Sequence, residues 1–147
     1  RFEIKECSRS EWAKFRNYHY MNTNIHKACK CYGLYDGNEI IGFYSVLHFP
    51  HPTNKRIKKG HRLVILPDYQ GIGLGSRFNE IIAQKYVDEG WDFRQTQSAR
   101  NIVEHLDKSP LWQRTSKPRN RGNETIGYGG LSLRDAVTSS FKYVGRQ

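Results

Sequence analysis

Three glycines, Gly71, Gly73 and Gly75, follow an apolar run at Leu63–Leu66 and precede a stretch with helical periodicity. Glycine allows the backbone to approach a ligand closely, with its N–H groups turned towards that ligand. At the start of a helix these N–H groups have no intrahelical partner, and the helix dipole favours a negative charge. The pattern therefore predicts a site for a phosphate or diphosphate group.

Two familiar phosphate-binding motifs fit this segment poorly. The P-loop requires a Gly-Lys-Ser/Thr triplet, which the sequence lacks. The dinucleotide fingerprint matches Gly71 and Gly73, but it places Gly or Ala where Ser76 stands. Its strand also runs directly into the first glycine, whereas residues 67–70 intervene here. A third kind of phosphate-binding loop is therefore favoured.

Periodicity surrounds the glycines with strands and helices. Strands are expected at 2–7, 29–35, 39–49, 62–66, 91–98 and 135–145, and helices at 8–20, 74–89 and 101–108. Ser8 and Glu11 have capping-box spacing at the start of the first helix. The second helix is expected to bury one face, consisting of Leu74, Phe78, Ile81, Ile82 and Tyr86. Loops are expected at 54–60 and 113–130, and the chain is expected to form one domain, 1–147.

The pattern Gln70-x-x-Gly73-x-Gly75, preceded by Pro67-x-Tyr69, resembles motif A of the GNAT (GCN5-related N-acetyltransferase) superfamily. The order of the expected strands and helices also resembles that of this superfamily. The resemblance implies an α/β (α+β) fold with a mixed central sheet of about six to seven strands flanked by helices on both faces. It implies an acyl-CoA cofactor, with acetyl-CoA as donor, and transfer of the acyl group to a primary or exocyclic amine.

The resemblance also implies which residues bind the cofactor. The backbone of the strand would pair with the pantetheine arm and polarise the thioester carbonyl, through Leu63, Val64 and Ile65. The loop and first helical turn would wrap the diphosphate, through Gln70, Gly71, Ile72, Gly73, Leu74, Gly75 and Ser76.

Candidate catalytic residues depart from the family pattern. Many members use a Tyr about seven residues beyond an Asn on the helix after the fifth strand, but Lys108 stands at that distance from Asn101. Our candidates are therefore His19 and Tyr20 at the end of the first helix, Arg62 beside His61, and Ser98 at the end of the fifth strand. His105 is a further candidate, and a surface or structural role is the alternative for each.

A narrower resemblance is to the phage Mom-type DNA-modification proteins, a divergent GNAT branch. It rests on His19-Tyr20, on 61–64 running into 67–71, and on the terminal segment 140–145. It implies that the exocyclic amine of adenine in DNA is modified, with the base flipped out of the duplex. A non-catalytic acyl-CoA-binding module is a second alternative.

Charge favours a polyanionic partner. The 147 residues include 24 Lys+Arg and 14 Asp+Glu, a net charge of +10. Nucleic acid, acidic proteins and phosphorylated cofactors all fit such an excess, and a merely soluble basic surface is the alternative. Lys55, Arg56, Arg119 and Arg121 are the predicted nucleic-acid-binding residues.

Composition excludes several other classes. At 37% hydrophobic and 13% aromatic residues the chain is globular, and no apolar run is long enough to span a membrane. Because Arg1 is not an initiator Met, the chain is expected to be trimmed or cut from a longer protein. Three cysteines, an odd number, favour a reducing cytoplasm. Cys29 and Cys31, with nearby histidines, lack a zinc spacing, so buried thiols are favoured over a metal site.

Overall fold

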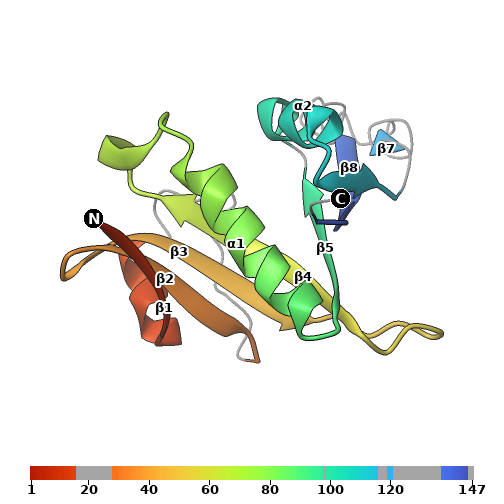
Figure 1. Cartoon of the computed structure of the whole chain (residues 1–147), viewed down its shortest axis with the longest axis horizontal. Helices are drawn as coiled ribbons and strands as arrows, with labels where there is room; N and C mark the ends of the chain where they lie inside the picture. The colour runs from red at the N-terminus through yellow and green to blue at the C-terminus, as the bar shows by residue number, and fades with distance from the viewer. Residues whose placement is uncertain (16–27, 98, 116–118, 121–136, 146–147) are drawn as a thin grey trace, which may run out of the picture. The chain divides into compact units, whose positions relative to one another are not determined.

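The computed structural model describes residues 1–15, 28–97, 99–115, 119–120 and 137–145. Eight strands and two α-helices lie within these residues (Figure 1). They divide into two compact units, Arg1–Phe93 and Arg94–Gln147. The predicted capping residues, motif and most strands fall in the first unit.

An antiparallel sheet forms the base of the first unit. Its strands, in spatial order, are β1 (Phe2–Cys7), β2 (Lys30–Asp36), β3 (Glu39–His48) and β4 (Ile57–Ile65). Gly37 turns the β2–β3 hairpin with a φ of 64°, a left-handed conformation that suits glycine. Among the described strands of this unit, β1 ends the series and pairs with β2 alone.

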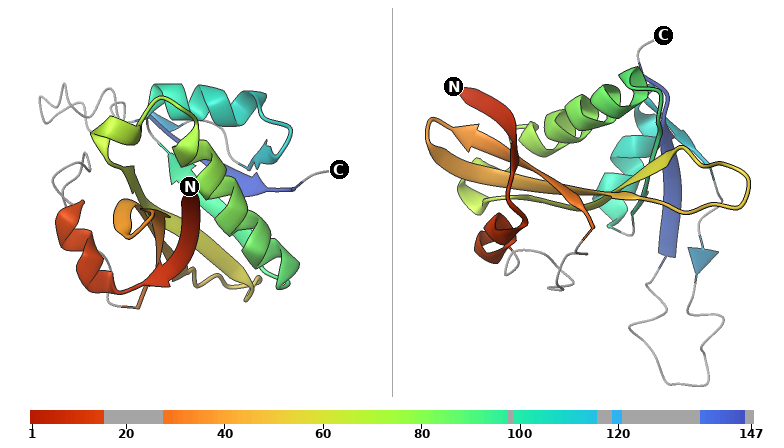
Figure 2. Two further views of the ribbon diagram at one scale, coloured as in Figure 1. Left: turned by 60° about the vertical axis from the view of Figure 1, so that its left-hand side comes forward. Right: turned by 90° about the horizontal axis from the view of Figure 1, so that it is seen from below.

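Helical segments cover both faces of this sheet, as Figure 2 shows for α1 and η1. The 3-10 helix η1 (Arg9–Lys14) packs Trp12, together with Phe15, against Phe43 on β3. Ser8 does cap it, accepting a hydrogen bond from the backbone N–H of Ser10 at 3.1 Å. The reciprocal capping box expected of Ser8 and Glu11 differs in detail: the Glu11 backbone N–H donates to the Ser8 carbonyl, and the Glu11 carboxylate accepts from Lys14. The expected continuation to residue 20 lies outside the described residues.

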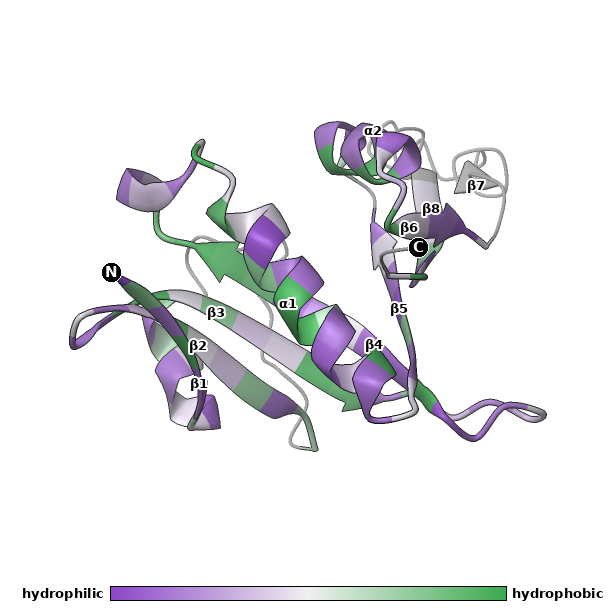
Figure 3. Ribbon diagram, in the orientation of Figure 1, coloured by the Kyte–Doolittle hydropathy of each residue, from purple (hydrophilic) through white to green (hydrophobic). Residues whose placement is uncertain are grey.

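The helix α1 (Leu74–Asp88) lies on the other face, which it contacts through buried side chains. Tyr44 on β3 donates to Asn79 Oδ1 at 2.6 Å, and the hydroxyls of Tyr32 and Tyr86 are 2.7 Å apart. Green and purple residues alternate along α1 in Figure 3, as expected for an amphipathic helix. Ile81 is a correction: it is 41% exposed, because it lies at the edge of the apolar face.

The strand β4 is longer than predicted. We expected a loop at 54–60 and a strand from 62, but β4 begins at Ile57, and Lys58 and Lys59 are opposite His48 and Leu47. The lysine ammonium groups lie over aromatic rings, Lys58 over Trp91 and Lys59 over Phe49. Their apolar stems can therefore occupy a half-buried strand while the charge is stabilised by an aromatic ring.

The second unit contains a smaller group of antiparallel strands. Its elements are β5 (Asp92–Gln97, which begins in the first unit), α2 (Arg100–Lys108), β6 (Trp112–Arg114), β7 (Arg119–Asn120) and β8 (Val137–Tyr143). The strand β8 pairs with β5, β6 and β7. The expected loop at 113–130 is therefore wrong where β6 and β7 form, since Trp112 packs against Tyr143 and draws that segment into pairing.

Candidate cofactor site

The end of β4 leads the chain into the glycine loop. Val64 and Ile65 are buried and lie opposite Phe43 and Gly42 of β3. Leu63, opposite Tyr44, is half-buried. The strand is therefore fixed along β3, and the next residues leave the sheet at a defined place.

A short 3-10 turn, η3 (Pro67–Tyr69), redirects the chain after β4. The Gln70 side chain reaches back and donates from Nε2 to the Ile65 carbonyl at 2.7 Å. The Tyr69 hydroxyl donates to Asp36 Oδ2 at 3.0 Å. These two hydrogen bonds tie the turn to β4 and to the β2–β3 hairpin, so the loop starts from a braced position.

The loop itself depends on left-handed glycines. Gly71 has a φ of 85° and Gly73 a φ of 83°, values that other residues adopt only with strain. At either position, the place that a Cβ atom would occupy has no neighbouring atom within 4 Å. The glycines are thus required by backbone conformation and not by crowding, and the space beside the backbone is open.

The first turn of α1 suits an anion. Gly73 is the N-cap residue and has no side chain with which to accept from the helix N–H groups. The first N–H groups of any α-helix lack intrahelical acceptors. The first turn contains no acidic residue, and Arg77 is exposed there. Backbone donors, helix dipole and guanidinium together favour a phosphate or diphosphate group.

At the C-terminal end of α1, other parts of the chain contact the residues that follow the helix. Arg56 Nε donates to the Gly90 carbonyl at 2.7 Å, and its guanidinium lies 4.8 Å from the Trp91 ring centre. The Asp92 backbone N–H donates to the Arg56 carbonyl at 2.7 Å. Arg56, a predicted nucleic-acid-binding residue, therefore has its Nε donor committed to this helix end.

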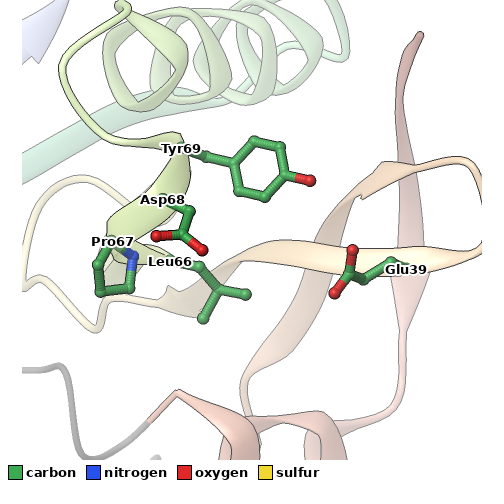
Figure 4. A pocket seen from close by; sticks show the side chains of 5 residues that line it. All are labelled: Glu39, Leu66, Pro67, Asp68 and Tyr69. Carbon is green, nitrogen blue, oxygen red and sulfur yellow. The ribbon is translucent and has the colours of Figure 1, made fainter.

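A surface pocket of about 540 Å³ borders η3. Figure 4 shows Asp68 and Tyr69 on one side of it and Glu39 on the other. Its two carboxylates would repel a phosphate group. The glycine loop, and not this pocket, is therefore the candidate anion site.

The described residues bring together only the cofactor half of the predicted site. Arg62 on β4 is half-buried, its backbone N–H donates to Ser45 Oγ at 3.1 Å, and burial lowers its pKa. On α2, Asn101, His105 and Lys108 are exposed. His19, Tyr20, Ser98 and Arg121 lie outside the described residues, and of Arg119 only the backbone, in β7, is described.

The cysteines form a group against the η1 core. Cys7 and Cys31 are opposite each other on β1 and β2, and the sulfurs of Cys29 and Cys31 are 3.7 Å apart. Burial raises the pKa of Cys7 to about 11 and that of Cys31 to about 12. At neutral pH both thiols are therefore protonated. In the described part of the chain, no three His, Cys, Asp or Glu side chains are grouped to hold a metal ion. No helix described there is long and apolar enough to cross a membrane.

Solved acetyltransferases share the fold. A Bacillus subtilis acetyltransferase in complex with CoA matches with a TM-score of 0.70 and 14% identity, over 97% of each chain. The ribosomal-protein-S18-alanine N-acetyltransferase of Escherichia coli matches with a TM-score of 0.70 and 13% identity, over 100% of this chain and 96% of that chain. A GNAT family acetyltransferase from Elizabethkingia anophelis with acetyl-CoA bound gives 0.62 and 12%, over 97% of each.

The fold class is therefore that of the GNAT acetyltransferases, as predicted. The family model for the acetyltransferase (GNAT) family matches residues 2–94, more than half of the chain, and the chain belongs to this family. The predicted enzyme class is confirmed, and the predicted cofactor class is the one bound in the neighbours with CoA and acetyl-CoA. Among curated proteins no match is found.

Proposed function

We propose that this chain is an acetyl-CoA-dependent N-acetyltransferase acting on a primary or exocyclic amine. The observation that carries the proposal is the continuous arrangement of a buried strand end, two left-handed glycines and a helix start free of acidic residues. This arrangement fits the diphosphate of acetyl-CoA, which supplies an activated acyl group when bound. The family and the cofactors of the neighbours support it.

The residues divide into two binding roles. The backbone of 70–76, together with the Arg77 guanidinium, would hold the diphosphate. Arg77 is not among the residues that the motif indicates, because it lies just beyond the motif, although a basic residue at the start of this helix is a visible signal in the sequence. The backbone of Leu63, Val64 and Ile65 would hold the pantetheine arm. Holding the acyl group and amine together would then supply much of the acceleration. Arg62, His19, Tyr20 and Ser98 stay our candidates for contact with the reacting atoms.

Acetyl-CoA binding by paired glycine variants tests the proposal. Gly73→Glu places a carboxylate in the loop and should abolish binding measured by calorimetry. Gly37→Glu is the matched control, because Gly37 is also left-handed, also has open space, and lies in the β2–β3 turn. Both variants suffer similar backbone strain, so only a local effect separates them. Equal binding by Gly73→Glu and the wild type would sink the assignment, and binding without turnover of any amine would favour a non-catalytic module.

A nucleic-acid acceptor is the second candidate. It is favoured by the basic β3–β4 hairpin, where Lys58 Nζ is 4.3 Å from the Trp91 ring centre and Lys59 Nζ is 4.7 Å from that of Phe49. Lys55 Nζ donates to the His51 carbonyl at 3.2 Å. Ammonium groups already placed by their neighbours lose less freedom on contacting phosphates. This proposal also rests on the Mom-type resemblance and includes Arg56, Arg119 and Arg121.

Two measurements test the second candidate. Lys55→Gln with Lys59→Gln should weaken duplex DNA binding and flatten its salt dependence. Lys14→Gln with Lys85→Gln removes the same charge from lysines that are ion-paired with Glu11 and Glu89, and should change the salt slope less. Nucleoside mass spectrometry of DNA and RNA from expressing cells, beside Gly73→Glu, should show a modified adenosine. Unmodified nucleosides would move the search to protein and small-molecule amines.

A further inference from the structure

The three cysteines of the chain lie together on the face of the sheet that packs against η1. Cys31 is on β2, Cys29 lies two residues before it, and Cys7 on β1 is opposite Cys31. Cys31 belongs to the buried cluster around Trp12, and the other two cysteines pack against that cluster. The proposed cofactor site uses none of these thiols, so their grouping calls for a separate account.

The sulfurs of Cys29 and Cys31 are already close, at 3.7 Å. A disulfide has an S–S distance of about 2.05 Å, so the two atoms need to approach by less than about 2 Å. The described pairing of β2 begins at Lys30 with β3 and at Cys31 with β1, so Cys29 precedes it. A rotation about the Cα–Cβ bond of Cys29 can therefore bring the sulfurs together without disturbing the strand pairing.

The three thiols differ in how readily they can react. The thiolate is the nucleophile in cysteine chemistry. Burial, and then the charge of Glu11, raises the pKa of Cys7 to about 11. Burial, and then the charge of Cys29 and the hydrogen bond with it, raises the pKa of Cys31 to about 12. Cys31 is also only 4% exposed, whereas Cys29 is half-buried. A dissolved reagent should therefore react first with Cys29, and the adjacent Cys31 should react second.

We propose that Cys29 and Cys31 are a modification site, at which hydrogen peroxide oxidises the two thiols to a reversible disulfide. The Cys29 thiolate attacks one peroxide oxygen and the O–O bond breaks, which leaves a sulfenic acid on Cys29 and a hydroxide that takes up the proton released by Cys29. The Cys31 sulfur then attacks the Cys29 sulfur. The S–O bond breaks as the S–S bond forms, and the hydroxyl leaves as water with the proton of Cys31. The two thiols thus supply the two electrons that reduce the peroxide to water.

The value of such a pair is chemical and not structural. A disulfide that closes so short a loop removes little freedom from the unfolded chain, so it adds little stability. A second thiol beside a sulfenic acid instead traps it as a disulfide, before further peroxide converts it irreversibly to a sulfinic acid. Small-molecule thiols return the disulfide to two thiols by exchange. The pair therefore records exposure to peroxide in a form that can be reset.

Peptide mapping of the full chain tests the pair directly. Trypsin cleaves after Lys and Arg, so the three cysteines fall in separate peptides, 6–9, 28–30 and 31–55. Reduced protein treated with equimolar hydrogen peroxide should become about 2 Da lighter, because two thiol protons are lost. Peptide 28–30 should then stay joined to 31–55 until reductant is added, and an alkylating reagent should label Cys7 alone. Dithiothreitol should restore all three thiols.

Two variants separate this pair from the third thiol. Cys7→Ala should form the same disulfide as the wild type, whereas Cys29→Ala should keep its mass at the same peroxide dose. A disulfide that joins 6–9 to 31–55 would assign the reaction to the opposed strands and overturn the proposal. Sulfinic acid at Cys29, a disulfide between two copies, or three unmodified thiols would overturn it as well. Mapping of the wild type needs no variant to fold and no acetyl-CoA, so its outcome is independent of the proposed function.

Discussion

Both ends of α1 have backbone groups without intrahelical hydrogen-bond partners, but the surroundings of the two ends differ. At the C-terminal end, Gly90 and its neighbours are joined to Arg56, whose guanidinium also packs on Trp91. At the N-terminal end, Gly73 supplies no side-chain cap, and the backbone faces open space. Helix ends leave unpaired backbone groups wherever they occur. At the C-terminal end, the backbone N–H groups of Glu89, Gly90 and Trp91 donate to carbonyls of the last turn, and Arg56 braces the residues that follow. The N-terminal end has no such side-chain partner, and it is there that we propose the cofactor binds, so stability and binding would be divided between the two ends.

Weakening the packing of α1 against the sheet should destabilise both ends of the helix, and this is the largest expected effect. Phe78 is 1% exposed and packs edge-on against Tyr44. Phe78→Ala should lower the free energy of unfolding by about 3–5 kcal/mol, since a large buried ring leaves a cavity. Urea denaturation measures this. A loss below about 1 kcal/mol would mean that α1 is not anchored through this residue.

Changing the C-terminal end alone should affect stability without affecting the cofactor. Arg56→Gln removes the hydrogen bond to Gly90 and the contact with Trp91, so we expect a loss of about 1–2 kcal/mol in unfolding free energy. Acetyl-CoA affinity at a temperature where the variant is folded should stay within about twofold of the wild type. A tenfold loss of affinity would show that the two ends are not independent.

Changing the N-terminal end alone should produce the reverse result. Arg77→Gln removes an exposed charge from the first turn, so the unfolding free energy should change by less than about 0.5 kcal/mol. Acetyl-CoA should bind about 3- to 5-fold more weakly, and added salt should reduce the difference from the wild type. Calorimetry at two salt concentrations checks this. An unchanged affinity would remove Arg77 from the site and leave the backbone as the sole source of anion binding.

The smallest expected effect is the pH dependence of stability that arises from Tyr32, which pairs with Tyr86 in the C-terminal half of α1. Burial, and then the hydrogen bond with Tyr86, raise the pKa of Tyr32 well above its ordinary value near 10. A raised folded-state pKa gives stability that is complete below the unfolded-state pKa and is lost as the pH rises towards the folded-state pKa. At pH 10.5 the loss should reach about 0.8 kcal/mol for this tyrosine. Tyr32→Phe should show a smaller decline between pH 8.5 and 10.5 in urea titrations, and an identical decline would contradict this account.

Sequence periodicity accounts for much of the first unit, because each buried face there has a clear apolar signal. The hairpin at Gly37 and the helix after Gly73 were both predictable from local chemistry. The beginning of β4 was not, since Lys58 and Lys59 occupy strand positions only because aromatic rings lie under their charges. Ile81 has the same hydrophobicity as Ile82, and only the position of the sheet decides which of the two is buried.

The candidate site was predictable where a motif determines backbone conformation and less so where single side chains act. The glycine loop falls in the first group. Arg77 falls in the second: it lies just beyond the glycine motif, so motif matching ignores it, although its basic side chain near the start of a helix is visible in the sequence. The predicted roles of His19, Tyr20 and Ser98 stay predictions, because they depend on residues outside the described part of the chain.

Among the strands that the structure describes, β1 ends its sheet, and this position has a consequence for how copies of this protein behave at high concentration. A strand with one unpaired side can recruit a strand from another molecule and begin an aggregate. Here that strand carries Glu3, Lys5 and Glu6, of which Lys5 lies over the Tyr35 ring and Glu6 pairs with Lys30. A strand from a second copy would have to pair beside these charged side chains, and charged residues on an end strand disfavour such pairing. The same few residues that complete the sheet therefore also protect the molecule from polymerising along it.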